Sequence, residues 1–241
     1  MNVMKEQNWD VTPKEAVQIQ KELRDQVRIE PLGFTPKLIG GCDVSMNRFA
    51  KGGFAGFVTM SYPQLELLDH SVVKDTIPFP YVPGLLSFRE IPMLLKAWAG
   101  LTQKPQVLVV DGIGIAHPRR LGIASHLGIV LDIPTIGCAK SVLTGVYEEP
   151  PNVAGEYSYL RDAKSPNEII GAALRTKVNV KPIFISPGHK ITLEDSLALI
   201  TASVRKHRLP EETRFAHNVV NAYRIQDGLA HGEEGTGVLK L

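Results

Sequence analysis

The stretch QVLVVDGIGIAHPRR, residues 106–120, decides the fold predicted for this chain. Its four consecutive apolar residues at 107–110, three of them β-branched, predict a strand buried on both faces of a sheet. The run ends at Asp111 and Gly112, where a carboxylate meets a flexible backbone. A carboxylate at the mouth of a buried strand has to be paired, hydrogen-bonded or bound to a metal. The alternative is that Asp111 only begins a turn, which is the commoner role of an Asp-Gly pair.

Positive charge follows directly in the sequence. His117, Arg119 and Arg120 are expected to bring it to the same rim of the sheet. An acid that can hold a cation, beside cations that can hold phosphate, suggests chemistry on a phosphodiester.

Composition excludes several classes of protein. The chain has 241 residues, 44% hydrophobic and 22% charged, which is ordinary for a globular protein with a complete core. We find no internal repeat and no second-domain boundary, so one domain is expected over residues 1–241. The 27 basic and 25 acidic residues give a net charge of +2, so any nucleic-acid binding would depend on local clusters.

The cysteines and the N-terminal sequence indicate the cellular compartment in which the protein is expected. Cys42 and Cys138 are far apart and form no CxxC motif, so reduced thiols in a cytoplasmic protein are expected and a zinc site is not. The N-terminus has no apolar signal region, and no stretch is long enough to cross a membrane. The Gly- and Glu-rich tail, from about residue 228, is expected to be mobile.

Further strands and helices follow from hydrophobic spacing and turn signals. A strand at 37–43 also ends in an aspartate, Asp43, and the strands at 54–61 and 65–73 continue it as an antiparallel meander. Two strands of one sheet that both end in Asp are an improbable coincidence. Thr12, Pro13 and Glu15 form a capping box for a helix whose apolar face extends to Val27. The remaining expected strands are 133–137, 155–161, 169–177 (strand or helix) and 182–189, and the remaining helices are 86–98, 121–131, 192–204 and 211–224.

Five side chains are candidates for chemistry: Asp43, Glu90, Asp111, Lys140 and His217. Glu90 lies at helical spacing within an apolar face, where a carboxylate needs a partner, although a surface Glu at the edge of that face is equally compatible. Lys140 could contact a phosphate or a catalytic carboxylate, and His217 lies on a polar helix face; solvation is the ordinary alternative for both. Three carboxylates on two strands and a helix suit Mg²⁺, which prefers oxygen ligands and keeps waters that can become nucleophiles.

Several motifs resemble those of endonuclease V, the inosine-directed nuclease family of the ribonuclease H-like superfamily. They run over most of residues 37–217 and are GGCDVS (40–45), PYVPGLLSFRE (80–90), VLVVDGIGIAHPRRLGIASHLG (107–128), PTIGCAKS (134–141), YLRDAKSPNEIIGAALRTK (159–177) and PIFISPGHKITLEDSLALI (182–200). The resemblance implies an α/β fold with a mixed five-stranded core sheet, helices on both faces and extra elements at the ends.

The resemblance also implies roles for the five candidates. Asp43 and Asp111 would bind Mg²⁺, or Mn²⁺ in its place, with Glu90 in the same acidic cluster. His217 would be the catalytic histidine, positioning water or a second metal. Lys140 would lie close to the scissile phosphate. The reaction implied is cleavage on the 3′ side of deoxyinosine, one nucleotide beyond the lesion, leaving a 3′-hydroxyl and a 5′-phosphate.

The resemblance further implies how the damaged base is read. The loop formed by Pro80, Tyr81, Val82 and Pro83 matches the family's wedge, commonly PYIP, with Val82 replacing Ile. The two prolines stiffen the loop, so Tyr81 can fill the gap left when a base leaves the stack. The flipped hypoxanthine would enter a pocket lined by backbone. The expected pocket and substrate-binding residues are Gly84, Leu86, Gly112, His117 and Gly137.

Two alternatives remain. One is another ribonuclease H-like nuclease such as a junction resolvase, against which the wedge and the glycine-lined pocket argue. The other is a non-cleaving inosine-binding protein, against which the three acids argue, because pure binding does not need groups that repel phosphate. The sequence leaves open whether the physiological partner is DNA containing deoxyinosine or inosine-containing RNA, and whether one or two metals bind. A monomer is the expected oligomeric state.

Overall fold

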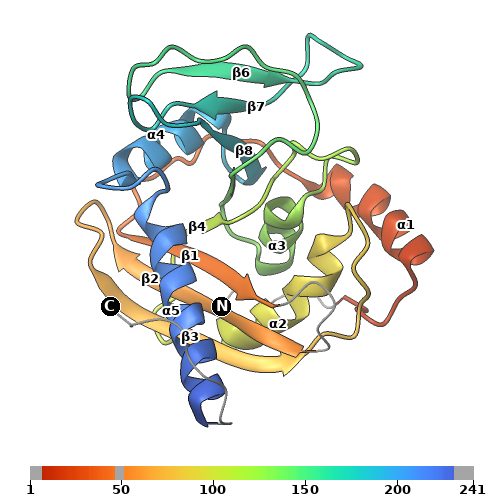
Figure 1. Cartoon of the computed structure of the whole chain (residues 1–241). Helices are drawn as coiled ribbons and strands as arrows, with labels where there is room; N and C mark the ends of the chain where they lie inside the picture. Colours follow the sequence, from red (N-terminus) through yellow and green to blue (C-terminus); the bar gives the residue numbers. More distant parts are fainter. Residues whose placement is uncertain (1–6, 47–51, 231–241) are drawn as a thin grey trace.

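Eight strands form one mixed sheet in the computed structural model, which describes residues 7–46 and 52–230 (Figure 1). The order of the strands across the sheet is β3-β2-β1-β4-β5-β8-β7-β6. The strands are β1 (Leu38–Ser45), β2 (Gly52–Ser61), β3 (Leu67–Thr76), β4 (Val107–Val110), β5 (Thr135–Ala139), β6 (Tyr157–Arg161), β7 (Ile169–Leu174) and β8 (Ile183–His189). The helices are α1 (Pro13–Leu23), the 3₁₀ turn η1 (Arg24–Gln26), α2 (Leu86–Gly100), α3 (Ile123–Leu131), α4 (Leu193–Ser203) and α5 (Glu211–Ala230).

The expected five-stranded core forms five of the eight strands of this larger sheet. Strands β1, β2 and β3 pair antiparallel as a meander, and β4 and β5 add to β1 in parallel. This order and these directions are those of the ribonuclease H-like fold. Strands β8, β7 and β6 then extend the sheet antiparallel from the β5 edge. The fold class is therefore confirmed, and the sheet is three strands wider than its core.

The run at 107–110 has helices on both sides, as its apolar sequence predicts. Val107 and Val109 belong to a core cluster with α4 and α5, whereas Leu108 and Val110 belong to a second cluster with α2 and α3. Successive side chains of a strand point to opposite faces, so a continuous apolar run is needed where both faces are covered. All four residues are buried.

Two helix ends differ from the expectation. Helix α1 ends at Leu23 rather than continuing to Val27, because the chain turns there and the Arg28 N–H donates to His189 Nδ1 at 3.3 Å on β8. Helix α5 continues through residue 228 to Ala230, and an ion pair of 2.6 Å between Lys74 and Asp227 fastens its last turns to β3. The helix is thus longer at its C-terminal end than the predicted range 211–224. The mobility expected from about residue 228 stays a prediction, and residues 231–241 lie outside the described residues.

Gly41 allows α5 to lie directly on β1. A Cβ built on Gly41 would be 2.2 Å from the backbone oxygen of Glu212, so no other residue fits without moving the helix. Gly41 and Asp43 share one face of β1 because side chains alternate along a strand. The close approach lets α5 lie across β1 (Figure 1). It also brings His217 on α5 within 3.0 Å of Asp43.

A buried histidine makes the stability of the fold sensitive to acid. His126 lies inside α3, where its Nε2 is 2.8 Å from Gln7 Oε1, its Nδ1 is 3.0 Å from Ser87 Oγ, and its ring contacts Trp9 and Phe88. Burial lowers the pKa of His126 to about 3, so the folded protein keeps this imidazole neutral well below the pH at which an unfolded chain protonates it.

We expect acid to destabilise the wild-type protein partly through this residue. Because the unfolded state binds more protons, the free energy of unfolding should fall as the pH drops below about 6.5, by about 1.4 kcal/mol per pH unit for this group. The free energy of unfolding can be measured in urea at pH 7 and at pH 5 for the wild type and for His126→Gln. The decrease from pH 7 to pH 5 should be smaller in the variant, by up to about 2 kcal/mol. The same loss in both proteins would contradict the assignment.

No helix within residues 7–46 and 52–230 combines the length and apolar character needed to cross a bilayer. Cys42 and Cys138 are both buried and unpaired.

Candidate active site

The three predicted carboxylates surround one cavity. The parallel ladder between β1 and β4 ends at the pair Cys42–Val110, so Asp43 and Asp111 follow on neighbouring strands. Glu90 reaches the same place from the second turn of α2. The cavity has a volume of about 200 Å³ and is lined by Cys42, Asp43, Val44, Glu90, Leu94, Val110, Asp111 and Ile123.

Burial and neighbouring carboxyl groups oppose ionisation of two acids in this cavity. Burial, followed by the charges of Asp43 and Asp111, raises the pKa of Glu90 to about 8. Burial also raises the pKa of Asp43; the imidazole of His217 opposes the shift and the charge of Asp111 adds to it. Acidic side chains in a cleft, with the pKa values of Glu90 and Asp43 raised by burial and by neighbouring charge, are typical of a functional site.

Two cationic or polar side chains contact these acids from the other side. Lys140 Nζ lies 2.5 Å from Asp111 Oδ2. Burial works against the charge of Lys140, but this hydrogen bond and the negative charges of Asp111 and Asp43 leave its pKa raised. His217 Nδ1 lies 3.0 Å from Asp43 Oδ2, and Asn221 Nδ2 lies 2.8 Å from His217 Nε2. His217 is therefore held between two partners rather than only solvated.

The donor set fits a hard divalent cation. Among the described residues, no three His, Cys, Asp or Glu side chains stand close enough together to enclose a metal ion by themselves. The acids instead border a cavity, and their donors are carboxylate oxygens. Mg²⁺ binds in this manner, because it prefers oxygen ligands, uses one or two carboxylates and keeps several waters.

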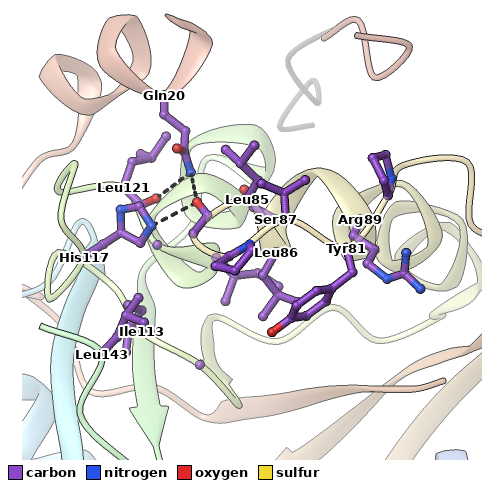
Figure 2. A pocket seen from close by; sticks show the side chains of 17 residues that line it. Gln20, Tyr81, Leu85, Leu86, Ser87, Arg89, Ile113, His117, Leu121 and Leu143 are labelled. Atoms are coloured by element: carbon purple, nitrogen blue, oxygen red, sulfur yellow. Dashed lines mark hydrogen bonds between the residues drawn. The ribbon is translucent and has the colours of Figure 1, made fainter. Parts of the chain in front are cut away.

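Figure 2 shows the side chains that line a second, mainly apolar cavity. Its volume is about 230 Å³, and Ile123 lines both cavities. Tyr81 and Leu86 are exposed at 42% and 39%, so the expected wedge loop presents side chains to solvent next to this cavity. The lining residues are Gln20, Pro80, Tyr81, Val82, Pro83, Gly84, Leu85, Leu86, Ser87, Arg89, Gly112, Ile113, His117, Leu121, Gly122, Ile123 and Leu143.

Most residues expected at the base pocket line this cavity, but Gly137 does not. A Cβ on Gly137 would be 2.4 Å from the Gly114 nitrogen, so this glycine lies behind the loop that follows β4. It lets that loop approach β5 and does not reach the cavity wall. Gly137 is thus not among the residues that line this cavity, and main-chain atoms of Ile113 lie next to it instead.

The predicted phosphate-binding rim at 117–120 is also wrong. His117 is 3% exposed, and burial, followed by the charge of Arg119, lowers its pKa to about 4, so it is neutral near pH 7. Arg119 Nη2 donates to the Gly84 carbonyl at 2.8 Å. Arg120 binds Asp162 at 2.7 Å and Glu168 at 2.8 Å. Arg119 and Arg120 are therefore bound to groups of the protein itself, which lie far away in sequence and are brought next to them by the fold.

Several residues of the second cavity were not anticipated from the sequence. Gln20 is the most informative, because it lies 1% exposed on the apolar face of α1, four residues after the buried Ala16. A polar side chain on an apolar helix face is a signal that it has a buried partner. The other unanticipated lining residues with side chains are Leu85, Ser87, Arg89, Ile113, Leu121, Ile123 and Leu143.

The fold and the acidic cavity together define a nuclease of the ribonuclease H-like class. The sequence model of the family described as Endonuclease V matches residues 21–218. An endonuclease V from Dictyoglomus thermophilum is 48% identical over 204 residues, which are 85% of this chain and 87% of the relative. The chain therefore belongs to the endonuclease V family and is a phosphodiester-hydrolysing enzyme.

Solved structures agree with this assignment. The endonuclease V from Streptomyces avermitilis has a TM-score of 0.85 and 37% identity, covering 94% of this chain and 99% of that one. The endonuclease V from Ciona intestinalis was solved in complex with a 24mer DNA containing an inosine followed by a ribo-adenosine. It has a TM-score of 0.78 and 28% identity, covering 89% of this chain and 98% of that one.

Proposed function

We propose that this chain cuts DNA on the 3′ side of deoxyinosine, one nucleotide beyond the lesion, with Mg²⁺ as its metal. The observation that carries the proposal is the adjacency of the two cavities. Asp111 lines the acidic cavity, its neighbour Gly112 lines the apolar one, and Ile123 belongs to both. A base held in the apolar cavity would thus leave its own backbone beside the carboxylates.

The apolar cavity suits a base that has left the helix. Its volume of about 230 Å³ is below the range of roughly 300–1,000 Å³ that is typical for drug-sized ligands, as expected for a pocket that accepts a single base. Leu86 and Ser87 begin α2, and the N–H groups of a first helical turn have no acceptor within the helix. Such donors can bind the O6 of hypoxanthine, where adenine carries an amino group instead.

The acidic cavity suits the cleavage step. Asp43, Glu90 and Asp111 would hold Mg²⁺, or Mn²⁺ in its place, and the ion would offset charge on the phosphate and supply an activated water. Lys140, beside Asp111, would bind the phosphate oxygen that lies next to the metal ligands. His217, fixed by Asp43 and Asn221, would orient the attacking water. The DNA complex of the Ciona relative supports DNA as the substrate class.

The remaining parts of the proposal concern the state of the protein. A cytoplasmic monomer made of one domain over residues 1–241 is proposed. The free thiols Cys42 and Cys138 support a reducing compartment, and the single sheet through the described residues supports one domain.

The acidic cavity distinguishes this function from its rivals. A non-cleaving inosine-binding protein would gain nothing from three carboxyl groups, two of them with raised pKa values, next to the place where a phosphate must lie. A junction resolvase would not need a base-sized cavity beside an exposed loop such as 80–83.

The deciding experiment is a nicking assay on one duplex prepared with and without a single deoxyinosine, and on the matching RNA. We expect one Mg²⁺-dependent cut, 3′ to the inosine and absent with EDTA, and the ratio of DNA to RNA cleavage would identify the preferred substrate. Tight inosine binding without cleavage would favour the binding protein, and cleavage independent of inosine would favour a different nuclease.

Metal binding should depend on pH through Glu90. Its pKa of about 8 means that near pH 6 the carboxyl is protonated and a poor ligand. Apparent Mg²⁺ affinity, measured by calorimetry without DNA, should therefore rise by up to about tenfold per pH unit as the pH increases from 6 and level off above about pH 8. Glu90→Gln should bind Mg²⁺ more weakly and with a flatter pH profile. A wild-type affinity that does not change from pH 6 to pH 9 would refute this role for Glu90.

A further inference from the structure

The carbonyl oxygen of Gly84 accepts three hydrogen bonds from side chains that are far apart in sequence. Gln20 Nε2 donates at 3.0 Å, His117 Nε2 at 3.1 Å and Arg119 Nη2 at 2.8 Å. Figure 2 shows the bonds from Gln20 and His117 converging on this oxygen at the edge of the apolar cavity. A carbonyl oxygen has two lone pairs, so this acceptor is saturated by the protein itself.

Gln20 is fully engaged in this arrangement. Its Nε2 also donates to the Leu121 carbonyl at 3.3 Å, and its Oε1 accepts from Arg119 Nε at 2.5 Å. The residue is 1% exposed, so the desolvation of its amide is offset only by these bonds. Gln20 thereby connects α1 to the segments around residues 84 and 119–121.

The histidine and the arginine are arranged to support the same oxygen. Arg119 N donates to His117 Nδ1 at 3.1 Å, which leaves the proton of the neutral ring on Nε2, the atom that faces Gly84. Gly84 itself has a φ of +78°, a conformation in which a side chain would be strained, and a Cβ there would be 2.8 Å from Arg119 Nη2. The three donors therefore hold a peptide group that only glycine can provide.

This peptide joins the two parts of the proposed base-recognition site. Before Gly84 lies the loop of residues 80–83, whose exposed Tyr81 is the proposed wedge. After it comes the first turn of α2, whose Leu86 and Ser87 carry the N–H groups proposed to bind the base. The Gly84 carbonyl and the Leu85 N–H belong to one planar peptide, and this N–H donates to the Val82 carbonyl of the loop at 3.0 Å. Because Leu85 is the residue before α2, the direction of the carbonyl fixes where the first turn begins relative to the loop.

We propose that Gln20 is a specificity-determining positioning residue, which fixes the Gly84 peptide and so sets the wedge loop and the base-binding turn in one geometry. It acts through Gly84 and does not itself bind the base. Because the Gly84 oxygen is saturated, the base is read here by donors and not by this acceptor. The inference rests on the proposed function, since it assigns Gln20 to recognition of the same flipped base. Gln20 lies one residue before the segment that the family's sequence model matches.

The test is the selectivity of binding, measured as the ratio of Kd values for undamaged and inosine-containing duplex in EDTA. Gln20→Met keeps the shape but cannot donate, and Gln20→Glu keeps the acceptor for Arg119 but places a carboxylate against the Gly84 oxygen. Both variants should lower the ratio by about tenfold, which corresponds to the loss of one buried hydrogen bond. Gln18→Met is the control, because Gln18 lies on the exposed side of α1 and its side-chain amide donates to Glu22 on the same helix.

The ratio of the two Kd values distinguishes a loss of positioning from a loss of folded protein. Fewer active molecules would weaken binding to both duplexes equally and leave the ratio unchanged, so an unchanged ratio in both variants overturns the inference. If Gln20→Met does not fold, Gln20→Glu decides alone. If the wild type itself neither prefers nor cuts inosine-containing DNA, the proposed function has failed instead. Wild-type selectivity that survives in the Gln20 variants refutes only the role of Gln20.

Discussion

Replacing Asp43 or Asp111 with asparagine is expected to reduce the rate of inosine-directed cleavage by at least about a thousandfold. Metal ions contribute several kcal/mol of charge stabilisation to phosphoryl transfer, and about 1.4 kcal/mol corresponds to a factor of ten in rate. Asparagine keeps the shape of the side chain but removes one negative charge from the cavity. The expected loss is therefore in the reaction, not in the fold.

Binding separates this explanation from general damage. Asp43→Asn and Asp111→Asn should bind inosine-containing duplex at least as tightly as the wild type, because a charge that repels phosphate has been removed. Asp25→Asn is a suitable control, since Asp25 is exposed and its side chain pairs with the neighbouring Arg24. Single-turnover cleavage and fluorescence anisotropy give the two quantities. Cleavage at the wild-type rate by either variant would exclude that residue as a metal ligand.

Replacing Tyr81 with alanine should weaken cleavage of duplex DNA far more than cleavage of single strands. Tyr81 is 42% exposed at the edge of the apolar cavity, where its ring can stack on the base that faces the gap left by a flipped inosine. Stacking of a base on an aromatic side chain contributes about 1–3 kcal/mol, which corresponds to a loss of roughly 5- to 150-fold. In a single strand no gap in a base stack has to be filled, so the cleavage rate on that substrate should fall little.

The two substrates serve as controls for each other. Cleavage rates of a duplex and of the same inosine-containing strand alone should be compared for the wild type, Tyr81→Ala and Tyr81→Phe. The phenylalanine variant keeps the ring and should behave like the wild type. If Tyr81→Ala loses activity equally on both substrates, Tyr81 contributes to the pocket or the reaction rather than to opening the duplex.

Much of the fold could be predicted because its strongest signals are local. The apolar run at 107–110 and the capping box at Thr12 depend on residues close in sequence, and both are found in the structure. The ends of α1 and α5 could not be predicted. They depend on a hydrogen bond to His189 and an ion pair between Lys74 and Asp227, which are contacts between distant parts of the chain.

The candidate site divides in the same way. A carboxylate at the end of a buried strand indicates a functional site, because an unpaired charge there is costly. Asp43 and Asp111 could therefore be identified from the sequence. The fate of the positive charges at 117–120 could not, because nothing nearby in sequence indicates that Glu168 and the Gly84 carbonyl will receive them. Gln20 carried a usable signal, a polar residue on an apolar helix face, but its partners appear only in the fold.

The contact between Gly41 and α5 has a consequence for how this enzyme can vary. The helix rests on main-chain atoms of β1, so the distance between Asp43 and His217 is set without any side chain as a spacer. Neighbouring core residues can therefore be exchanged for others of similar volume while Asp43 and His217 keep their separation. A methyl group at position 41 would instead displace α5 away from β1, and His217 would move away from Asp43 with the helix. The core residues around the site can therefore vary in sequence, whereas position 41 must remain glycine.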